Sequence, residues 1–152
     1  MIHTIENDIA LKKKIQHYKN ELKSYTYYVN RINYLKRELD AVVHKMTGVT
    51  GIDTTQIRIT SVSTSKENFF ELMHQEEELN KRIAHYQERL DLIDGLLKWV
   101  DEPYDKVLRG IYIDKKTGYY KAIREYNIPY SESQLKRIIN SQIRSYIQAF
   151  KL

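Results

Sequence analysis

The chain has 152 residues, enough for one domain or two very small ones. Hydrophobic residues make up 41%, charged residues 30% and the mean hydropathy is −0.62, which excludes a membrane protein and favours a soluble, elongated helical one. The lack of cysteine excludes a disulfide framework and a thiolate metal site, and the N-terminus lacks the plan of a secretion signal, so we expect a cytoplasmic protein.

Charge is distributed unevenly along the chain, whose net charge is +5. Lys and Arg outnumber Asp and Glu by 9 to 5 in residues 1–50 and by 10 to 5 in residues 102–152, whereas residues 51–101 carry 6 against 10. Because opposite charges attract, we expect the first two segments to neutralise each other. The C-terminal segment would then keep a free positive surface.

The N-terminal third of the chain predicts one long helix. A separate stripe of Ile2, Ile5 and Ile9 precedes a regular seam, and no Gly or Pro lies between Met1 and Thr47, so an unbroken helix is expected. The seam residues recur at spacings of three and four, as in a coiled coil. They are Ile15, Tyr18, Leu22, Tyr25, Val29, Ile32, Lys36, Leu39, Val43 and Met46.

Residues 47–68 interrupt this pattern with two glycines and many Thr and Ser residues. We expect a loop over 47–68. Its β-branched residues Ile57, Ile59 and Val62 also suit a short strand pair. A connection of this length without secondary structure is uncommon, so the loop would have a function of its own or be disordered.

A second seam follows the loop, with Ser65 as the expected helix cap and Pro103 beyond the helix end. Its members are Phe69, Leu72, Glu76, Leu79, Ile83, Tyr86, Leu90, Ile93, Leu97 and Val100. Glu76 is the acidic member of this seam, as Lys36 is the basic member of the first seam.

The two seams predict an antiparallel helical hairpin. Pairing Met46 with Phe69 and Ile15 with Val100 places Lys36 in the layer next to that of Glu76. We expect these two charges to fix the register, because a slip would leave one of them unpaired in the seam. An intermolecular coiled coil can use the same seams, so a homodimer stays open as an alternative.

Leu92, Leu96 and Trp99 widen the apolar surface near the end of the second seam. We expect them to pack on the C-terminal helices, with a dimer contact as the alternative. A joint at residues 101–103 then divides the chain into a coiled-coil hairpin, residues 1–101 with loop 47–68, and a helix-turn-helix unit, residues 102–152. The predicted fold class is therefore all-α, a long antiparallel helical hairpin followed by a tri-helical unit.

The C-terminal unit is expected to contain helices over 104–112 and 119–126, a turn over 114–118, and a longer final helix. Asn127 suits a left-handed backbone position, and Pro129 prevents the preceding helix from continuing. Ser131 followed by Gln134 has the spacing of a capping box. The expected centre of the unit comprises Tyr112, Ile123, Tyr126, Ile128, Leu135 and Ile138.

The final helix has one apolar and one polar face. The residues expected to be buried are Leu135, Ile138, Ile139, Ile143, Tyr146, Ile147 and Phe150. The opposite face carries Ser133, Lys136, Arg137, Asn140, Ser141 and Arg144. Side chains of these types contact phosphates and base edges in DNA.

This layout resembles the phage and prophage late-gene transcription activators of the ArpU and RinA type, whose helix-turn-helix is similar to region 4 of sigma factors. The likeness is strongest in TSKENFFEL at 64–72, RGIYIDKK at 109–116 and NIPYSESQLKRIINSQI at 127–143. The separation of Ile128 from Leu135 is longer than is usual in sigma-like units, which implies a longer turn. The resemblance implies an activator of late genes in a phage or mobile element, with double-stranded DNA and host RNA polymerase as partners in a bacterial cytoplasm.

The residues themselves predict a DNA-binding surface. Phosphate contacts are expected from basic side chains, with Ser133, Gln134 and Asn140 reading bases and Arg137 taking a guanine edge. The complete predicted site comprises Lys115, Lys116, Lys121, Tyr130, Ser131, Ser133, Gln134, Lys136, Arg137, Asn140 and Arg144.

No catalytic, cofactor or metal site is expected. The five histidines show no ligand spacing, there is no glycine-rich phosphate loop, and acidic residues are spread along helix faces. The alternative function is a coiled-coil adaptor whose C-terminal unit binds a regulatory protein partner instead of DNA.

Overall fold

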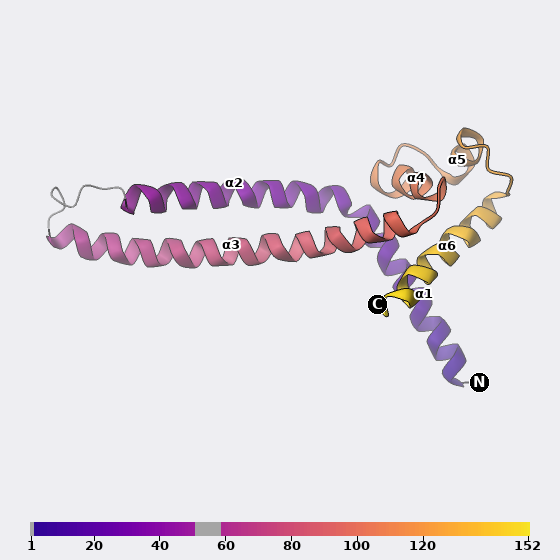
Figure 1. The fold of residues 1–152 in the computed structure, drawn as a ribbon, viewed down its shortest axis with the longest axis horizontal. Helices are drawn as coiled ribbons and strands as arrows, with labels where there is room; N and C mark the ends of the chain where they lie inside the picture. The colour runs from indigo at the N-terminus through magenta and orange to yellow at the C-terminus, as the bar shows by residue number, and fades with distance from the viewer. Residues whose placement is uncertain (1, 51–58) are drawn as a thin grey trace. The chain divides into compact units, whose positions relative to one another are not determined.

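The structure is a computed structural model that describes residues 2–50 and 59–152, and the side chains of residues 4–48 and 68–152. The all-α class is confirmed for these residues, because they form six α-helices and one short π-helix and no strand (Figure 1). The elements are α1 (Ile2–Lys23), α2 (Tyr25–Thr50), α3 (Ile59–Trp99), α4 (Tyr104–Leu108), the π-helix η2 (Arg109–Ile113), α5 (Tyr119–Glu125) and α6 (Glu132–Ala149). Within the described part, no helix is long and apolar enough to span a bilayer.

The helices group into two compact units. The terminal unit comprises Met1–Tyr27 and Arg89–Leu152, and the middle unit comprises Tyr28–Glu88. The sequence-based division between residues 101 and 102 therefore falls inside the terminal unit. The N-terminal helix belongs with the C-terminal helices, although 80 residues lie between the end of α1 at Lys23 and the start of α4 at Tyr104.

The unbroken N-terminal helix that the sequence predicts is interrupted at Ser24, so that prediction is wrong. The amide of Ser24 donates to the carbonyl oxygens of Asn20 and Glu21, both at 3.1 Å, and a new helix begins at Tyr25. The turn costs almost no backbone hydrogen bonding, but it changes which residues face inward beyond it.

The core of the middle unit follows a heptad pattern that starts after this turn. In Figure 1, α2 and α3 lie side by side and run in opposite directions. Leu35, Val42 and Leu79 are buried at their centre. The rings of Tyr28 and Tyr86 lie 5.7 Å apart between centroids. The partly buried residues that pack around this core are Leu39, Met46, Leu72, Ile83 and Tyr86.

Lys36 and Val43 do not belong to this core, contrary to the predicted seam. Lys36 is exposed, Val43 is 43% exposed, and Leu35 and Val42 are buried in their place. The shift by one residue spares a lysine ammonium the free-energy penalty of burial. The predicted role of Lys36 and Glu76 in fixing the register is therefore wrong.

The predicted loop over 47–68 is also too long. Helix α2 continues to Thr50 and α3 begins at Ile59, so Ser65 is not the helix cap. Ile59 and Val62 are helical, not in a strand, and Ile57 lies outside the described residues. Thr, Ser and β-branched residues lower helix propensity only slightly, and this weak preference misled the sequence-based prediction.

The core of the terminal unit forms where α6 meets α1 and the end of α3. The Tyr146 hydroxyl donates to the Leu92 carbonyl oxygen at 3.0 Å, and its ring meets Tyr18 edge-on at 5.9 Å. The fully buried side chains of the unit are Leu22, Ile93, Leu96, Val107, Leu108, Leu135, Ile139 and Ile143. Contacts between residues far apart in the chain therefore hold α6 in place.

The hydrophobic residues at the end of α3 pack only in part on the C-terminal helices. Leu96 is fully buried, whereas Leu92 and Trp99 are 38% and 40% exposed. Phe150 was expected in the buried stripe but is 57% exposed, and it meets Trp99 edge-on at 5.6 Å. The stripe ends at Ile147 because α6 ends at Ala149, which places Phe150 at the rim.

Gly95 allows α6 to approach α3 closely. A Cβ atom at this position would lie 2.8 Å from the Tyr146 hydroxyl oxygen, which is too near for an ordinary contact. At Gly48 in α2, a Cβ atom would meet nothing within 4 Å. The two glycines therefore form a matched pair, one required by packing and one not.

We predict that Gly95→Ala lowers the melting temperature, although Ala in a helix is favoured over Gly by about 1 kcal/mol. The added methyl group displaces the Tyr146 hydroxyl and breaks its bond to Leu92, and overpacking of this kind costs about 1–3 kcal/mol. Gly48→Ala, the control, should raise the melting temperature. Equal stabilisation by both substitutions in thermal melts monitored by circular dichroism would contradict the packing described.

The heptad register of the middle unit gives a second prediction. Leu35→Ala should lower the free energy of unfolding by about 2–5 kcal/mol, the usual range for a buried leucine. Lys36→Ala should change it by no more than about 0.5 kcal/mol, because Lys36 is exposed. Urea unfolding measures both values. A larger loss of unfolding free energy for Lys36→Ala than for Leu35→Ala would support the seam predicted from the sequence, with Lys36 inside it.

Candidate nucleic-acid interface

The helix pair α5 and α6 is joined by a turn that the sequence predicts in detail. Asn127 has a φ of 52°, which confirms the left-handed position expected there. The Ile128 amide donates to the Ile123 carbonyl oxygen at 3.0 Å, and its side chain is buried. Pro129 follows outside any helix. The turn thus ends α5 and fixes the point where α6 starts.

The capping box at the start of α6 is confirmed. The Ser131 hydroxyl oxygen accepts from the Gln134 amide at 3.3 Å, and the Gln134 side-chain oxygen accepts from the Ser131 amide at 2.9 Å. Both residues were predicted to contact DNA. In the structure, the side-chain oxygens of Ser131 and Gln134 are used to cap the helix. The two residues are therefore weaker candidates for contacting bases.

Helix α6 exposes two arginines on one face. Arg137 and Arg144 are both exposed, and seven residues are about 20° short of two full turns, so the side chains leave the helix in nearly the same direction. Ser133 and Ser141 are also exposed, while Leu135, Ile139, Ile143, Tyr146 and Ile147 are buried on the opposite side. Among the side chains that the structure describes, neither arginine forms an ion pair. This face of α6 is open and positive.

Asn140 departs from the expected polar face. It is half-buried, and its side-chain oxygen is shielded from solvent without a hydrogen-bond partner. Its position on α6 is at the edge between the exposed and the buried side. Sequence spacing placed it among the exposed residues because the boundary of a buried stripe is not visible in one helix alone.

Three further lysines of the predicted site lie outside α6. Lys115 and Lys116 are exposed in the turn after η2, where Lys115 has a φ of 53°. The Lys116 amide donates to the Gly110 carbonyl oxygen at 3.0 Å, which fixes this turn. Lys121 is exposed on α5, and Tyr130, between α5 and α6, is 42% exposed. Because these side chains are exposed, they are available to contact a ligand.

The segment before this turn differs from the single helix expected over 104–112. Helix α4 ends at Leu108, and a π-helical turn follows in which the Asp114 amide donates to the Arg109 carbonyl oxygen at 2.9 Å. Gly110 is needed there, since a Cβ atom would lie 2.8 Å from the Thr117 methyl group. The wider turn places Tyr112 and Ile113 in the core.

Lys136 lies beside residues that the sequence analysis did not connect with it. Its ammonium nitrogen lies 5.1 Å from the centroid of the Tyr119 ring, and the hydroxyls of Tyr119 and Tyr112 are 2.6 Å apart. On α1, the Lys23 nitrogen lies 5.9 Å from the Tyr112 ring centroid. Burial in the first place, and then the hydrogen bond with Tyr112, raise the pKa of Tyr119, so this hydroxyl stays protonated at physiological pH.

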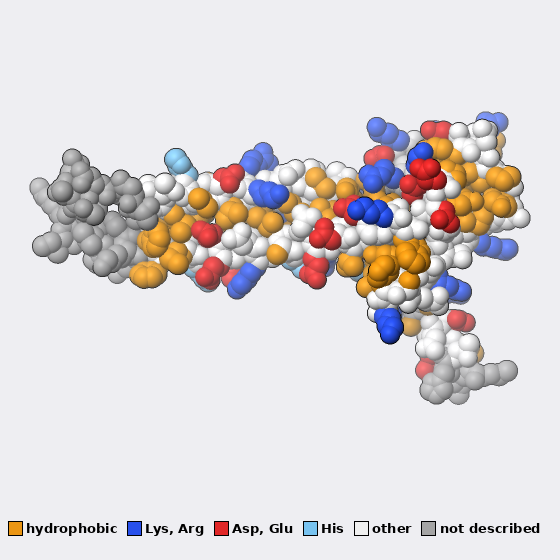
Figure 2. All heavy atoms as spheres, in the orientation of Figure 1, with side chains coloured by type: hydrophobic (Ala, Val, Ile, Leu, Met, Phe, Trp, Pro, Cys, Tyr) orange, Lys and Arg blue, Asp and Glu red, His pale blue; other side chains and the backbone are white. Residues whose placement is uncertain are grey.

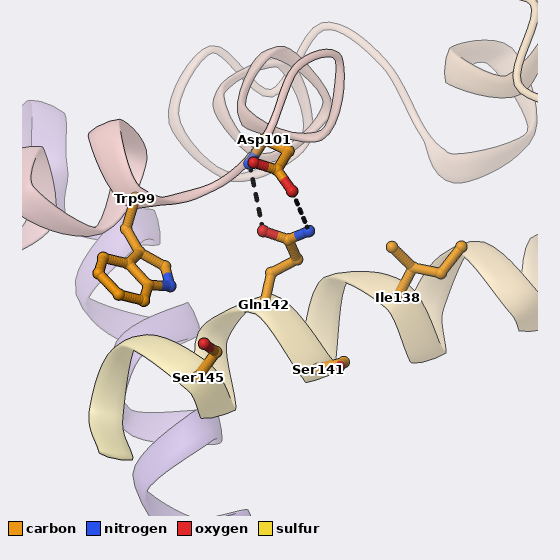
Figure 3. A pocket seen from close by; sticks show the side chains of 6 residues that line it. All are labelled: Trp99, Asp101, Ile138, Ser141, Gln142 and Ser145. Atoms are coloured by element: carbon orange, nitrogen blue, oxygen red, sulfur yellow. Dashed lines mark hydrogen bonds between the residues drawn. The ribbon is translucent and has the colours of Figure 1, made fainter. Parts of the chain in front are cut away.

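A pocket of about 490 Å³ lies where α6 passes the end of α3 (Figure 3). Gln142 closes a pair of hydrogen bonds with Asp101: its amide nitrogen donates to the Asp101 carboxylate at 3.1 Å, and its oxygen accepts from the Asp101 backbone amide at 3.2 Å. The other lining residues are Trp99, Ile138, Ser141 and Ser145. This pair of hydrogen bonds, the Gln142–Asp101 clip, holds α6 to the end of α3. It leaves the face of α6 that carries Arg137 open.

In the view of Figure 2, acidic and basic side chains both occur along α2 and α3. Within the described residues, no group of His, Asp and Glu side chains is placed to hold a metal ion. The α6 face, with its two exposed arginines, is our candidate for a polyanion-binding surface.

No family model, curated protein or solved structure matches the chain.

Proposed function

We propose that the protein is a sequence-specific, double-stranded-DNA-binding transcriptional regulator that acts through a helix-turn-helix formed by α5 and α6. The observation that carries this proposal is the pair Arg137 and Arg144, exposed on one face of a capped helix without acidic partners among the described residues. A helix of this kind fits the major groove, where arginine recognises guanine through two hydrogen bonds.

The residues divide into two roles in this proposal. Arg137 and Arg144, with Ser133 beside them, contact base edges. Lys115, Lys116, Lys121 and Lys136 neutralise phosphates at the margins of the groove. Asn140, Ser131 and Gln134 act mainly on the position of α6, since the first is half-buried and the other two form the capping box.

The resemblance to late-gene activators of the ArpU and RinA type completes the proposal. On this basis the protein activates late genes of a phage or mobile element in the cytoplasm of a bacterial host, with the host RNA polymerase as a further partner. Helices α2 and α3 then act as a coiled-coil hairpin, and a homodimer through this part would match paired half-sites in DNA.

An adaptor that binds a protein is the second candidate. The exposed side chains of Leu92, Trp99 and Phe150 favour it, because large hydrophobic groups at a surface often mark a protein contact. An adaptor would show no saturable binding to DNA at low salt.

We predict that Arg137→Ala weakens binding to a preferred duplex by about 1–3 kcal/mol, roughly five- to 150-fold, and binding to unrelated duplexes far less. The reason is that a base contact is lost only where the correct base is present. Arg82→Ala is the matched control, since Arg82 is an exposed arginine on α3 in the middle unit.

A salt-titrated fluorescence anisotropy assay with labelled duplexes measures both variants. If Arg137→Ala and Arg82→Ala bind every duplex as the unaltered protein does, the α6 face does not recognise DNA. If the unaltered protein shows no saturable binding at low salt, the adaptor function replaces the regulator.

A further inference from the structure

Two lysines from distant segments lie over a pair of hydrogen-bonded tyrosines in the terminal unit. Lys23 on α1 lies over the Tyr112 ring, and Lys136 on α6 lies over the Tyr119 ring, with 5.9 Å and 5.1 Å between nitrogen and ring centroid. The two hydroxyls are hydrogen-bonded at 2.6 Å, which joins both halves into one cluster. We name Lys19, Lys23, Lys136, Tyr112 and Tyr119 the lysine–tyrosine cluster.

Lys19 is the third basic member of the cluster. It is half-buried on α1, one helical turn before Lys23. Burial first, and then the nearby ammonium groups of Lys136 and Lys23, lower the pKa of Lys19. The three positive charges therefore act on one another even though α1 and α6 are far apart in the sequence.

No carboxylate forms an ion pair with these lysines in the described part of the chain. The ion pairs there join Lys81 to Glu78, Arg89 to Glu21 and Lys106 to Glu102, and none involves a lysine of the cluster. Glu132, which acts on Tyr119 and precedes Lys136 by four residues, forms no ion pair with it. Like charges gathered without an ion pair oppose folding, and the two ammonium–ring contacts offset only part of this repulsion.

The chemistry of the cluster fits a phosphate group. Ammonium groups supply charge and three donors each, and in a pair of bonded hydroxyls the accepting one keeps its own hydrogen free to donate outward. Tyr119 stays protonated at physiological pH, so the hydrogen bond between the two hydroxyls persists. A phosphate oxygen can use both kinds of donor.

We propose that Lys19 and Lys23 of α1, together with Lys136 of α6, bind a backbone phosphate of the same DNA duplex whose groove α6 enters. This inference rests on the proposed function and extends the DNA interface to the N-terminal helix. Helix α1 then serves as a second contact that positions α6 on the duplex. Contacts to phosphate strengthen binding to every sequence, in contrast to those of Arg137.

The test compares two double variants by salt-titrated anisotropy. Lys19→Gln/Lys23→Gln removes two charges from the cluster, and Lys12→Gln/Lys13→Gln removes two from exposed positions elsewhere on the same helix. We expect the first variant to reduce the slope of log affinity against log salt by about 0.9, the value for one phosphate contact. The reduction should be the same on preferred and unrelated duplexes, and at least twice that of the control.

Thermal melting separates this role from a structural one. Because Lys19→Gln/Lys23→Gln relieves repulsion, it should melt at the same temperature as the unaltered protein or higher at low salt. A lower melting temperature would assign the lysines to stability and overturn the inference. Lys23→Gln alone, at an exposed position, gives a second variant that we expect to keep its fold.

The outcomes distinguish this inference from the proposed function. If the unaltered protein binds DNA and Arg137→Ala weakens binding, but the cluster variant behaves as its control does, only the inference fails. If inorganic phosphate raises the melting temperature of the unaltered protein while the cluster variant keeps the full salt slope, the site serves a free anion and the inference also fails. If no duplex is bound, both fail together.

Discussion

The side chain of Tyr146 joins the helices on which the C-terminal surface depends. Its ring meets Tyr18 of α1 edge-on, and its hydroxyl donates to the Leu92 carbonyl oxygen on α3. The approach requires a residue without a side chain at Gly95. Burial raises the pKa of Tyr146, so the hydroxyl remains a donor at physiological pH. Because these contacts fix α6 on its buried side, the opposite side keeps a constant set of exposed residues.

The exposed side of α6 carries charges that its described surroundings leave unpaired. The Gln142–Asp101 clip occupies one margin of α6, and the lysine–tyrosine cluster occupies another near its start. Between them, Arg137 and Arg144 are exposed without an ion pair among the described residues. Exposed ion pairs contribute only about 0–1 kcal/mol, so the absence of a described carboxylate paired with these arginines costs little stability. Unpaired cations on a rigid support suit a polyanion, in line with the function we propose.

Structural features that depend on residues close together in the chain were the easiest to predict from the sequence. The left-handed Asn127 and the capping box of Ser131 and Gln134 depend on neighbouring residues, and the structure contains both. The predicted buried stripe of α6 is present in part, because Ile138 is only half-buried while Leu135, Ile139, Ile143, Tyr146 and Ile147 are buried. The errors arose where local preference was weak or where distant segments meet. The helix is interrupted at Ser24, and beyond it Leu35 and Val42 are buried in place of Lys36 and Val43, while Leu39 and Met46 keep their predicted places in the seam. The packing of α1 on α6 could not be predicted, because no periodicity within one segment specifies its partner, and the role we propose for Lys19 and Lys23 follows from that packing.

The central claim is that the open face of α6 reads base sequence, and selection of duplexes from a random library by the full chain tests it most directly. If α6 enters the major groove, repeated rounds should enrich a short motif that contains guanine at the position of Arg137, and two copies of the motif if the protein is a dimer. A selected pool without any common motif, at a salt concentration where the protein still binds, would contradict the claim.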